Sequence, residues 1–174
     1  DVVAVSADQR RALDIQVREV ESGRIDSGIE LLGAIQPNGD RLAHIVPRFP
    51  GIVREVRKTA GDVVRSGDVL AIIESSDSLA PYELKTMIDG VVLSRHLTRG
   101  EAVDREKEAF TIADLSTVWV DLSVYPRDLP RVKVGQAVRI HAVHGDVGAE
   151  GDVTYITPTV DEVTRTAVAR VILP

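Results

Sequence analysis

The most regular hydrophobic pattern in the chain is a short β-unit that occurs twice between Pro47 and Ile112. In each copy, apolar runs alternate with tight corners made of a glycine and an acidic residue, which is typical of short strands in hairpins. An offset of 39 residues matches Gly51 with Gly90, Val53 with Val92, Thr59 with Thr98, Gly61 with Gly100, Asp62 with Glu101, Val64 with Val103 and Ile73 with Ile112. Because so short a unit cannot bury its apolar face alone, the repeat predicts two copies packed face to face as one small sandwich.

Alternating apolar and polar positions predict further strands on both sides of the repeat. Before it, we expect strands at residues 15–20 and 29–35, following a helical turn over residues 8–13 that Ser6 caps. After it, we expect strands at residues 118–124, 136–143, 153–157 and 167–173, a helical corner at 126–132 and a glycine-spaced loop at 145–151. Several short strands with regular turn signals predict a small β-barrel. The strand at 29–35 would complete this barrel, so that the repeat is an insertion into it.

Composition and charge narrow the classes of function. The chain has 174 residues, of which 44% are hydrophobic and only 3% aromatic, so its cores must be built from Val, Ile, Leu and Ala. The net charge of −6 argues against a nucleic-acid partner, which requires a basic excess. The absence of cysteine excludes disulfides and thiolate chemistry. No apolar run approaches the roughly 18 residues of a membrane-spanning helix.

The sequence contains no constellation that predicts an enzyme. There is no nucleophile elbow, no metalloprotease motif and no glycine pattern for cradling phosphate, so we expect neither catalysis nor a cofactor. His141 and His144 are candidate ligands for Zn²⁺ or Cu²⁺. However, a spacing of three does not place two side chains on one face of a strand. We therefore interpret them as solvent-facing histidines at a strand end and keep metal binding as the alternative.

Two further residues have a functional and a structural interpretation. Lys85 lies between the two copies, where a lipoyl or biotinyl carrier bears its modified lysine. The alternating pattern around it instead predicts a strand that leads into the second copy. Trp119 could anchor a partner, but at the start of a strand it is better interpreted as core or inter-domain packing.

The two half-motifs around Gly51 and Gly90 resemble the split lipoyl-like domain of periplasmic adaptor proteins, also called membrane fusion proteins or the HlyD family. Residues 113–120 resemble the start of that family's β-barrel, and residues 160–171 resemble the return toward its membrane-proximal domain. Within the family, the chain resembles the adaptors of tripartite heavy-metal efflux pumps of the resistance–nodulation–division (RND) class. The resemblance covers nearly the whole chain and rests on the order and spacing of these motifs.

The resemblance implies a mainly β fold in which a lipoyl-like sandwich is inserted into a small β-barrel. The sandwich would be residues 42–114, and the barrel would be residues 25–41 together with 115–174, its C-terminal end leading back to the membrane-proximal domain. Residues 1–24 would form part of that membrane-proximal β-domain, whose C-terminal partner would lie beyond this chain. Most family members carry a long α-helical hairpin between the lipoyl halves, where this chain has only a short loop at 75–82.

The implied function is that of a periplasmic adaptor associated with the inner membrane. It would link a proton-driven efflux transporter to an outer-membrane channel for export of heavy-metal cations, assemble as a hexamer and meet metal cations transiently. Without the hairpin, we expect the distal contact surface to be the loop residues Ser76, Asp77, Ser78 and Leu79. The alternatives are a periplasmic metal-binding chaperone or sensor and a lipoyl or biotinyl carrier domain.

Overall fold

The computed structural model describes residues 5–12, 14, 28–142 and 148–174, and the chain divides into two compact units, Asp1–Glu30 and Leu31–Pro174. In the first unit, helix α1 (Ala7–Ala12) begins after Ser6, which confirms the predicted helical turn. The Ser6 hydroxyl accepts a hydrogen bond from Gln9 N, and Gln9 Oε1 accepts one from Ser6 N, which is a reciprocal capping box. The strand predicted at 15–20 and most of the expected membrane-proximal segment lie outside the described residues.

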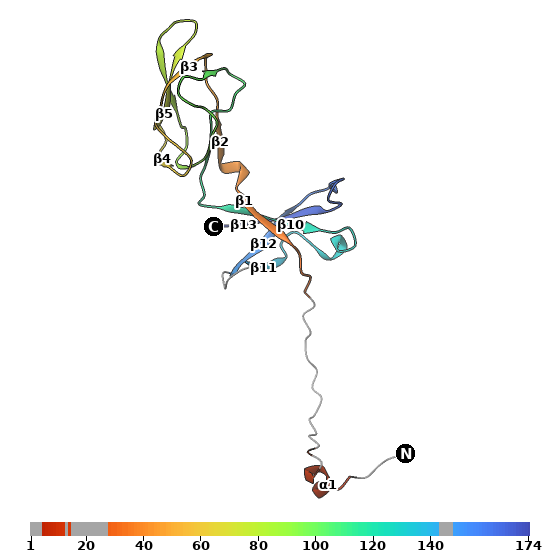
Figure 1. Cartoon of the computed structure of the whole chain (residues 1–174). Helices are drawn as coiled ribbons and strands as arrows, with labels where there is room; N and C mark the ends of the chain where they lie inside the picture. Colours follow the sequence, from red (N-terminus) through yellow and green to blue (C-terminus); the bar gives the residue numbers. More distant parts are fainter. Residues whose placement is uncertain (1–4, 13, 15–27, 143–147) are drawn as a thin grey trace. The chain divides into compact units, whose positions relative to one another are not determined.

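Residues 42–113 form two four-stranded antiparallel sheets that pack as a sandwich (Figure 1). One sheet has the strand order β2 (Leu42–Ile45), β9 (Phe110–Ala113), β7 (Gly90–Arg95) and β4 (Val63–Val64). The other has the order β6 (Pro81–Lys85), β5 (Val69–Ser75), β3 (Gly51–Val56) and β8 (Ala102–Val103). The predicted sandwich is confirmed. Its layers are not the two copies, however, because each sheet combines strands from both copies.

Equivalent hydrogen bonds on the two sides of the sandwich explain this exchange of strands. Gly61 N donates to Val92 O, and Val92 N donates to Asp62 O. The offset of 39 residues predicts the same bonds in the other half, and there Gly100 N donates to Val53 O and Val53 N donates to Glu101 O. The register also shifts between Val53 and Glu55 in one sheet and between Val92 and Ser94 in the other. The sequence repeat is therefore an internal pseudo-twofold symmetry of the sandwich.

The first glycine of each copy is required by a close backbone approach. A Cβ atom at Gly51 would overlap the carbonyl oxygen of Glu74 and would lie 2.8 Å from Cγ2 of Ile73. A Cβ atom at Gly90 would overlap the carbonyl oxygen of Ala113, the residue equivalent to Glu74. Both positions therefore exclude every side chain, which explains why the glycines align in the sequence.

The core of the sandwich consists almost entirely of aliphatic side chains. From Ala71 to Ser75, strand β5 shows the alternation of a strand with one buried face. Leu70 is also fully buried, at the register shift between Val69 and Ala71. Phe110 is the largest fully buried side chain of the core and the only aromatic one among the described residues. The rest of this core is built from Val, Ile, Leu and Ala, as the low aromatic content of the sequence predicts.

The second part of unit Leu31–Pro174 is one five-stranded antiparallel sheet. Its order is β1 (Gly33–Pro37), β10 (Val118–Val124), β13 (Ala167–Leu173), β12 (Gly148–Ile156) and β11 (Ala137–His141). Strand β1 precedes the sandwich in the sequence, and β10 follows it. Because these two strands pair with each other, the sandwich is inserted between two neighbouring strands of the sheet. The strand predicted at 29–35 in fact begins at Gly33 and continues to Pro37. A proline can occupy the last position because β1 is an edge strand, where no backbone donor is required.

The region that follows β10 in the sequence has the predicted elements except in one place. The predicted helical corner is the 3₁₀ turn Leu129–Arg131, and the strand at 167–173 is confirmed. The loop predicted at 145–151 is wrong for its last part, because β12 already begins at Gly148. Gly148 pairs with His141, and a Cβ atom at Gly151 would lie 2.7 Å from Cγ1 of Val171. Here the glycines allow close packing within a strand, and they do not mark a turn.

A charged and aromatic cluster joins three strands of this sheet. Arg170 forms two hydrogen bonds with Asp121, of 2.7 and 2.9 Å, and its guanidinium lies 3.5 Å from the centroid of Trp119. Gln36 of β1 also donates to Asp121. On the other side, Trp119 packs against Gly39 of the 3₁₀ turn Gly39–Arg41, which leads to the sandwich. Trp119 therefore serves packing, as its position in the sequence indicates.

Removing Asp121 from this cluster should destabilise the five-stranded sheet. We expect Asp121→Ala to lower the free energy of unfolding by about 2 kcal/mol, because it leaves the largely buried Arg170 guanidinium without its acceptor. The matched control is Glu150→Ala. The side chains of Glu150 and of its ion-pair partner Arg139 are each 80% exposed, so this pair should contribute under about 0.5 kcal/mol. Urea unfolding followed by the fluorescence of Trp119 measures both variants, and equal losses would contradict the prediction.

Candidate functional site

The turn at residues 76–80, called the tip turn below, connects β5 to β6 at one end of the sandwich. Figure 1 shows it at the end of the sandwich opposite the one from which the chain continues to β1 and β10. The register agrees, because Ser75 pairs with Gly51 at the start of β3. No helix stands between β5 and β6, since the described chain passes directly from one strand to the next.

Ser75 organises the tip turn. Its side chain is buried, and its hydroxyl accepts hydrogen bonds from the backbone N–H groups of Asp77 and Ser78, at 3.3 and 3.4 Å. Its own N–H donates to Ala80 O, and its carbonyl accepts from Leu79 N. The turn thus has a defined backbone, although residues 76–80 are all exposed.

Leu79 stands out within the turn. Its φ of +55° lies in the left-handed region, which costs a non-glycine residue roughly 1–2 kcal/mol. Its side chain is 73% exposed, so burial does not offset this cost in the isolated chain. The turn therefore holds an apolar side chain in solvent, next to the acidic Asp77.

An aromatic cluster that the sequence analysis missed lies beside the tip turn. Phe49 and Tyr82 meet edge to face with ring centroids 5.8 Å apart, and the Tyr82 hydroxyl donates to Phe49 O. Burial raises the pKa of Tyr82. Arg105 lies 5.6 Å above the exposed ring of Phe49, and Pro50, the next residue, accepts a hydrogen bond from Ser76 N. In a chain with so few aromatic residues, a Phe outside the predicted strands was the one signal in the sequence that could have indicated this cluster.

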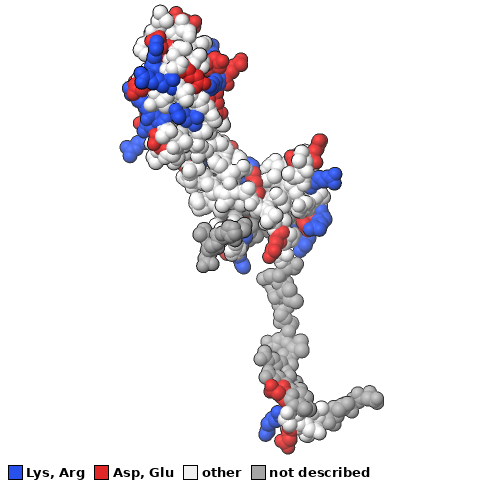
Figure 2. Space-filling model, viewed as in Figure 1, with Lys and Arg blue, Asp and Glu red and all other residues white. Residues whose placement is uncertain are grey.

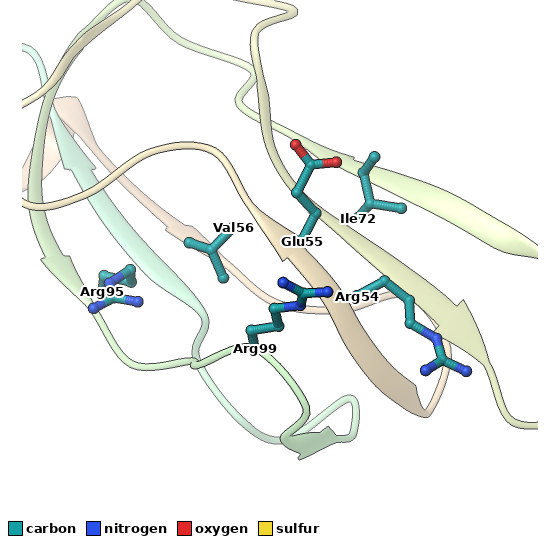
Figure 3. A pocket seen from close by; sticks show the side chains of 6 residues that line it. All are labelled: Arg54, Glu55, Val56, Ile72, Arg95 and Arg99. Atoms are coloured by element: carbon teal, nitrogen blue, oxygen red, sulfur yellow. The ribbon is translucent and has the colours of Figure 1, made fainter.

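An open hollow of about 580 Å³ lies elsewhere on the sandwich, lined by Arg54, Glu55, Val56, Ile72, Arg95 and Arg99 (Figure 3). Figure 2 shows Lys and Arg side chains gathered on one side of the sandwich. Arg54 is paired with Glu74, and Arg95 donates to Leu97 O. Arg99 has no partner within the part of the chain that the structure describes. The lining of the hollow brings together no nucleophile, base and oxyanion donor.

Two histidines flank one carboxylate on the sheet that contains β9. Glu108 lies just before β9, with His44 on the neighbouring β2 and His96 just after β7 on the other side. His44 Nδ1 lies 2.8 Å from one carboxylate oxygen, and His96 Nε2 lies 3.9 Å from the other. The hydrogen bond from the Thr111 hydroxyl, followed by that from His44, lowers the pKa of Glu108.

The remaining predicted site residues lie apart from these features. His141 is the exposed last residue of β11, and His144 lies outside the described residues. As the described side chains stand, no three His, Asp or Glu residues are spaced to hold a metal ion. Lys85 is the last residue of β6 and pairs with Glu83, which confirms its assignment to a strand.

A split lipoyl-like sandwich inserted between two strands of a second β-domain is the architecture of an adaptor protein. Residues 41–114 match the family model of the CzcB-like barrel-sandwich hybrid domain, and residues 117–174 match that of the CusB-like beta-barrel domain. Together these matches take in well over half of the chain. The chain belongs to the membrane fusion proteins, the adaptor family of RND efflux systems.

Two curated relatives support this assignment. The cobalt-zinc-cadmium resistance protein CzcB of Cupriavidus metallidurans is 27% identical over 241 residues, covering 98% of this chain and 46% of the relative. The cation efflux system protein CzcB of an Alcaligenes species matches with the same identity and coverage. The chain therefore spans about half the length of these relatives. Because the match extends over 241 residues and the chain has only 174, the relatives contain insertions that this chain lacks.

Solved structures show the same fold. ZneB from Cupriavidus metallidurans superposes with a TM-score of 0.72 at 20% identity, covering 81% of this chain and 88% of ZneB. A MacA–MexA chimera carrying the MexA α-hairpin of Pseudomonas aeruginosa gives a TM-score of 0.66 at 15% identity, covering 83% of this chain and 74% of the chimera. Among the helices of the described residues, none is long and apolar enough to cross a membrane.

Proposed function

We propose that this chain is the non-enzymatic adaptor subunit of a tripartite efflux pump that exports heavy-metal cations. It would act in the periplasm at the inner membrane, linking a proton-driven transporter to an outer-membrane channel, and would assemble as a hexamer. The observation that carries the proposal is the pair of consecutive family matches over the sandwich and the sheet into which it is inserted. The metal class rests on the relatives, which are named for cobalt, zinc and cadmium resistance and for cation efflux.

We also propose a division of the chain into domains. We assign residues 42–114 to the lipoyl-like domain, residues 25–41 and 115–174 to the β-barrel domain, and residues 1–24 to a membrane-proximal domain. An adaptor works through shape and contact, so its exposed surfaces are the functional elements. A carrier function is disfavoured because Lys85 pairs with Val69 within a sheet, whereas the turn that joins the two halves contains no lysine.

The tip turn is the proposed distal contact. Ser76, Asp77, Ser78 and Leu79 are exposed together on a backbone that Ser75 holds in place, and Leu79 presents an apolar side chain in an unfavourable conformation. Apolar side chains held in solvent on a defined backbone are typical of docking surfaces. With no helix between β5 and β6, this turn is the most distal element of the sandwich along β5.

Deletion of the gene tests the efflux function directly. We expect the deletion strain to be several-fold more sensitive to Zn²⁺, Co²⁺ and Cd²⁺ in growth assays, and the full-length gene to restore tolerance. Transporter and channel should copurify with the tagged full-length adaptor after mild cross-linking. Unchanged tolerance to these cations together with an absence of both partners would contradict the proposal.

A further inference from the structure

Two short connections of equal length join the sandwich to the five-stranded sheet. Residues 38–41 lead from β1 to β2, and residues 114–117 lead back from β9 to β10. Relative motion is the default expectation for two compact parts that only short linkers join. The contacts between the two connections therefore decide how freely the sandwich can turn.

The antiparallel register is the same on both sides of the junction. On the sheet side, Pro37 is the partner of Val118. On the sandwich side, Leu42 is the partner of Ala113. Each step forward from Pro37 to Leu42 is matched by one step back from Val118 to Ala113, so both pairs belong to a single register. The two connections therefore lie opposite each other along one continuous antiparallel ribbon.

Two side-chain pairs, called the junction pairs below, fasten this ribbon at its two ends. Nearer the sandwich, Arg41 forms an ion pair with Asp114 at 2.5 Å, and it also donates to the Ser116 hydroxyl at 2.8 Å. In the backbone, Asp114 N donates to Arg41 O at 3.0 Å. Nearer the sheet, Asn38 Nδ2 donates to Thr117 Oγ1 at 2.8 Å. Both junction pairs fall at positions that the continuous register places opposite each other.

Asn38 also fixes the conformation of its own connection. Its side chain is buried, and its Oδ1 accepts a hydrogen bond from Asp40 N at 3.0 Å, while its Nδ2 is bonded to Thr117. Its carbonyl oxygen accepts from Arg41 N, which closes the 3₁₀ turn Gly39–Arg41. A buried amide whose oxygen and nitrogen are both paired holds its surroundings in one arrangement.

The sheet supports the same turn from below. A Cβ atom at Gly39 would lie 2.8 Å from Cη2 of Trp119, so the turn lies directly against the indole ring. The ring is itself held in place, because the Arg170 guanidinium lies 3.5 Å from its centroid and is bonded to Asp121. The turn therefore cannot move toward the sheet without displacing this cluster.

We propose that the junction is a rigid coupling that fixes the direction of the sandwich relative to the five-stranded sheet, with the two junction pairs as its fastening. An exposed ion pair such as Arg41 with Asp114 contributes little alone. A rotation of the sandwich about the ribbon, however, would separate both pairs at once, so they resist it together. A movement imposed on the sheet is then carried to the tip turn. The inference does not rest on the proposed efflux function, because it is measured on the purified chain.

Spin labels can test this coupling, because the chain contains no cysteine and two introduced ones are labelled uniquely. Lys85→Cys on β6 and Glu150→Cys on β12 provide exposed positions, one in the sandwich and one in the sheet. We expect double electron–electron resonance to give one narrow distance distribution between them. In the labelled chain, Arg41→Ala/Thr117→Val removes both junction pairs and should broaden this distribution at least twofold. Neither of the two substituted side chains is buried, so both parts should stay folded.

The matched control is Arg54→Ala/Thr111→Val in the same labelled chain. It removes an ion pair with Glu74 and a hydroxyl hydrogen bond with Ser94, both inside the sandwich, and should leave the distribution unchanged. Circular dichroism establishes that each variant is folded. The single variants Arg41→Ala and Thr117→Val should give intermediate widths, and they provide the readout if the double variant is unfolded.

Three results would overturn the proposal. The first is a broad or multiple distribution in the labelled chain that keeps both junction pairs. The second is a distribution that stays equally narrow after the junction pairs are removed. The third is a control variant that broadens the distribution as much as the loss of the junction pairs does.

Discussion

Gly51→Ala is expected to destabilise the sandwich by about 3 kcal/mol, among the larger effects of a single methyl group. The added Cβ atom would overlap the carbonyl oxygen of Glu74, and this oxygen belongs to the backbone of the paired strand β5. Neither partner can rotate away, so β3 and β5 must separate and lose ladder hydrogen bonds. Gly90→Ala should have a similar effect, because Ala113 occupies the equivalent place.

Gly67→Ala is the control for this prediction. Gly67 has a φ of +92°, but a Cβ atom there has no neighbour within 4 Å. We expect a loss of only about 1–2 kcal/mol, from the left-handed conformation alone. Thermal or urea unfolding followed by far-ultraviolet circular dichroism compares the three variants. Fluorescence would be less informative, because the single tryptophan lies in β10, outside the sandwich. Equal losses for Gly51→Ala and Gly67→Ala would show that the backbone contact is not the cause.

The double variant Asp77→Lys/Leu79→Ala should abolish docking at the distal end of the adaptor. This expectation rests on the proposed contact at the tip turn. A central apolar anchor contributes about 2 kcal/mol or more to an interface, and reversing a neighbouring charge adds repulsion. We therefore expect at least a thirtyfold loss of affinity for the outer-membrane channel, and a fall in metal tolerance toward that of the deletion strain.

The same substitutions should leave the fold intact. Both side chains are exposed, and the turn is held by Ser75, which is unchanged. Met87→Ala/Glu150→Lys is a matched control, because it truncates one exposed apolar residue and reverses one exposed charge away from the tip turn. Copurification with the channel and growth on Zn²⁺ measure the outcome. If the tip variant assembles as well as the control, the distal contact lies elsewhere.

Much of the fold could be predicted because the repeated residues are required either by local turns or by the internal symmetry of the sandwich. Glycines at the start of each copy and at the corners define the strands, and the 39-residue offset defines the sandwich. The partition of strands between the sheets was not predictable in this way. It depends on backbone hydrogen bonds such as Gly61 N to Val92 O, which join residues of different copies. The start of β12 was missed for a related reason, since Gly148 and Gly151 resemble turn residues until their neighbours are known.

Of the candidate contact surfaces, one was predicted from the sequence and another was not. The tip turn was identified from sequence because polar residues and Pro81 interrupt two apolar runs. The aromatic pair Phe49 and Tyr82 was missed, because three strands separate its members in the sequence.

The sequence by itself determined the β-class, the internal repeat, the insertion of one β-domain into another and the resemblance to adaptor proteins. All of these depend on the order and spacing of residues along the chain. Only the tertiary structure decided which side chains meet. His44 and His96 are far apart in sequence, and they approach Glu108 only because β9 lies between β2 and β7 in one sheet. Strand order is set by long-range pairing, so no local pattern could have placed these three residues together.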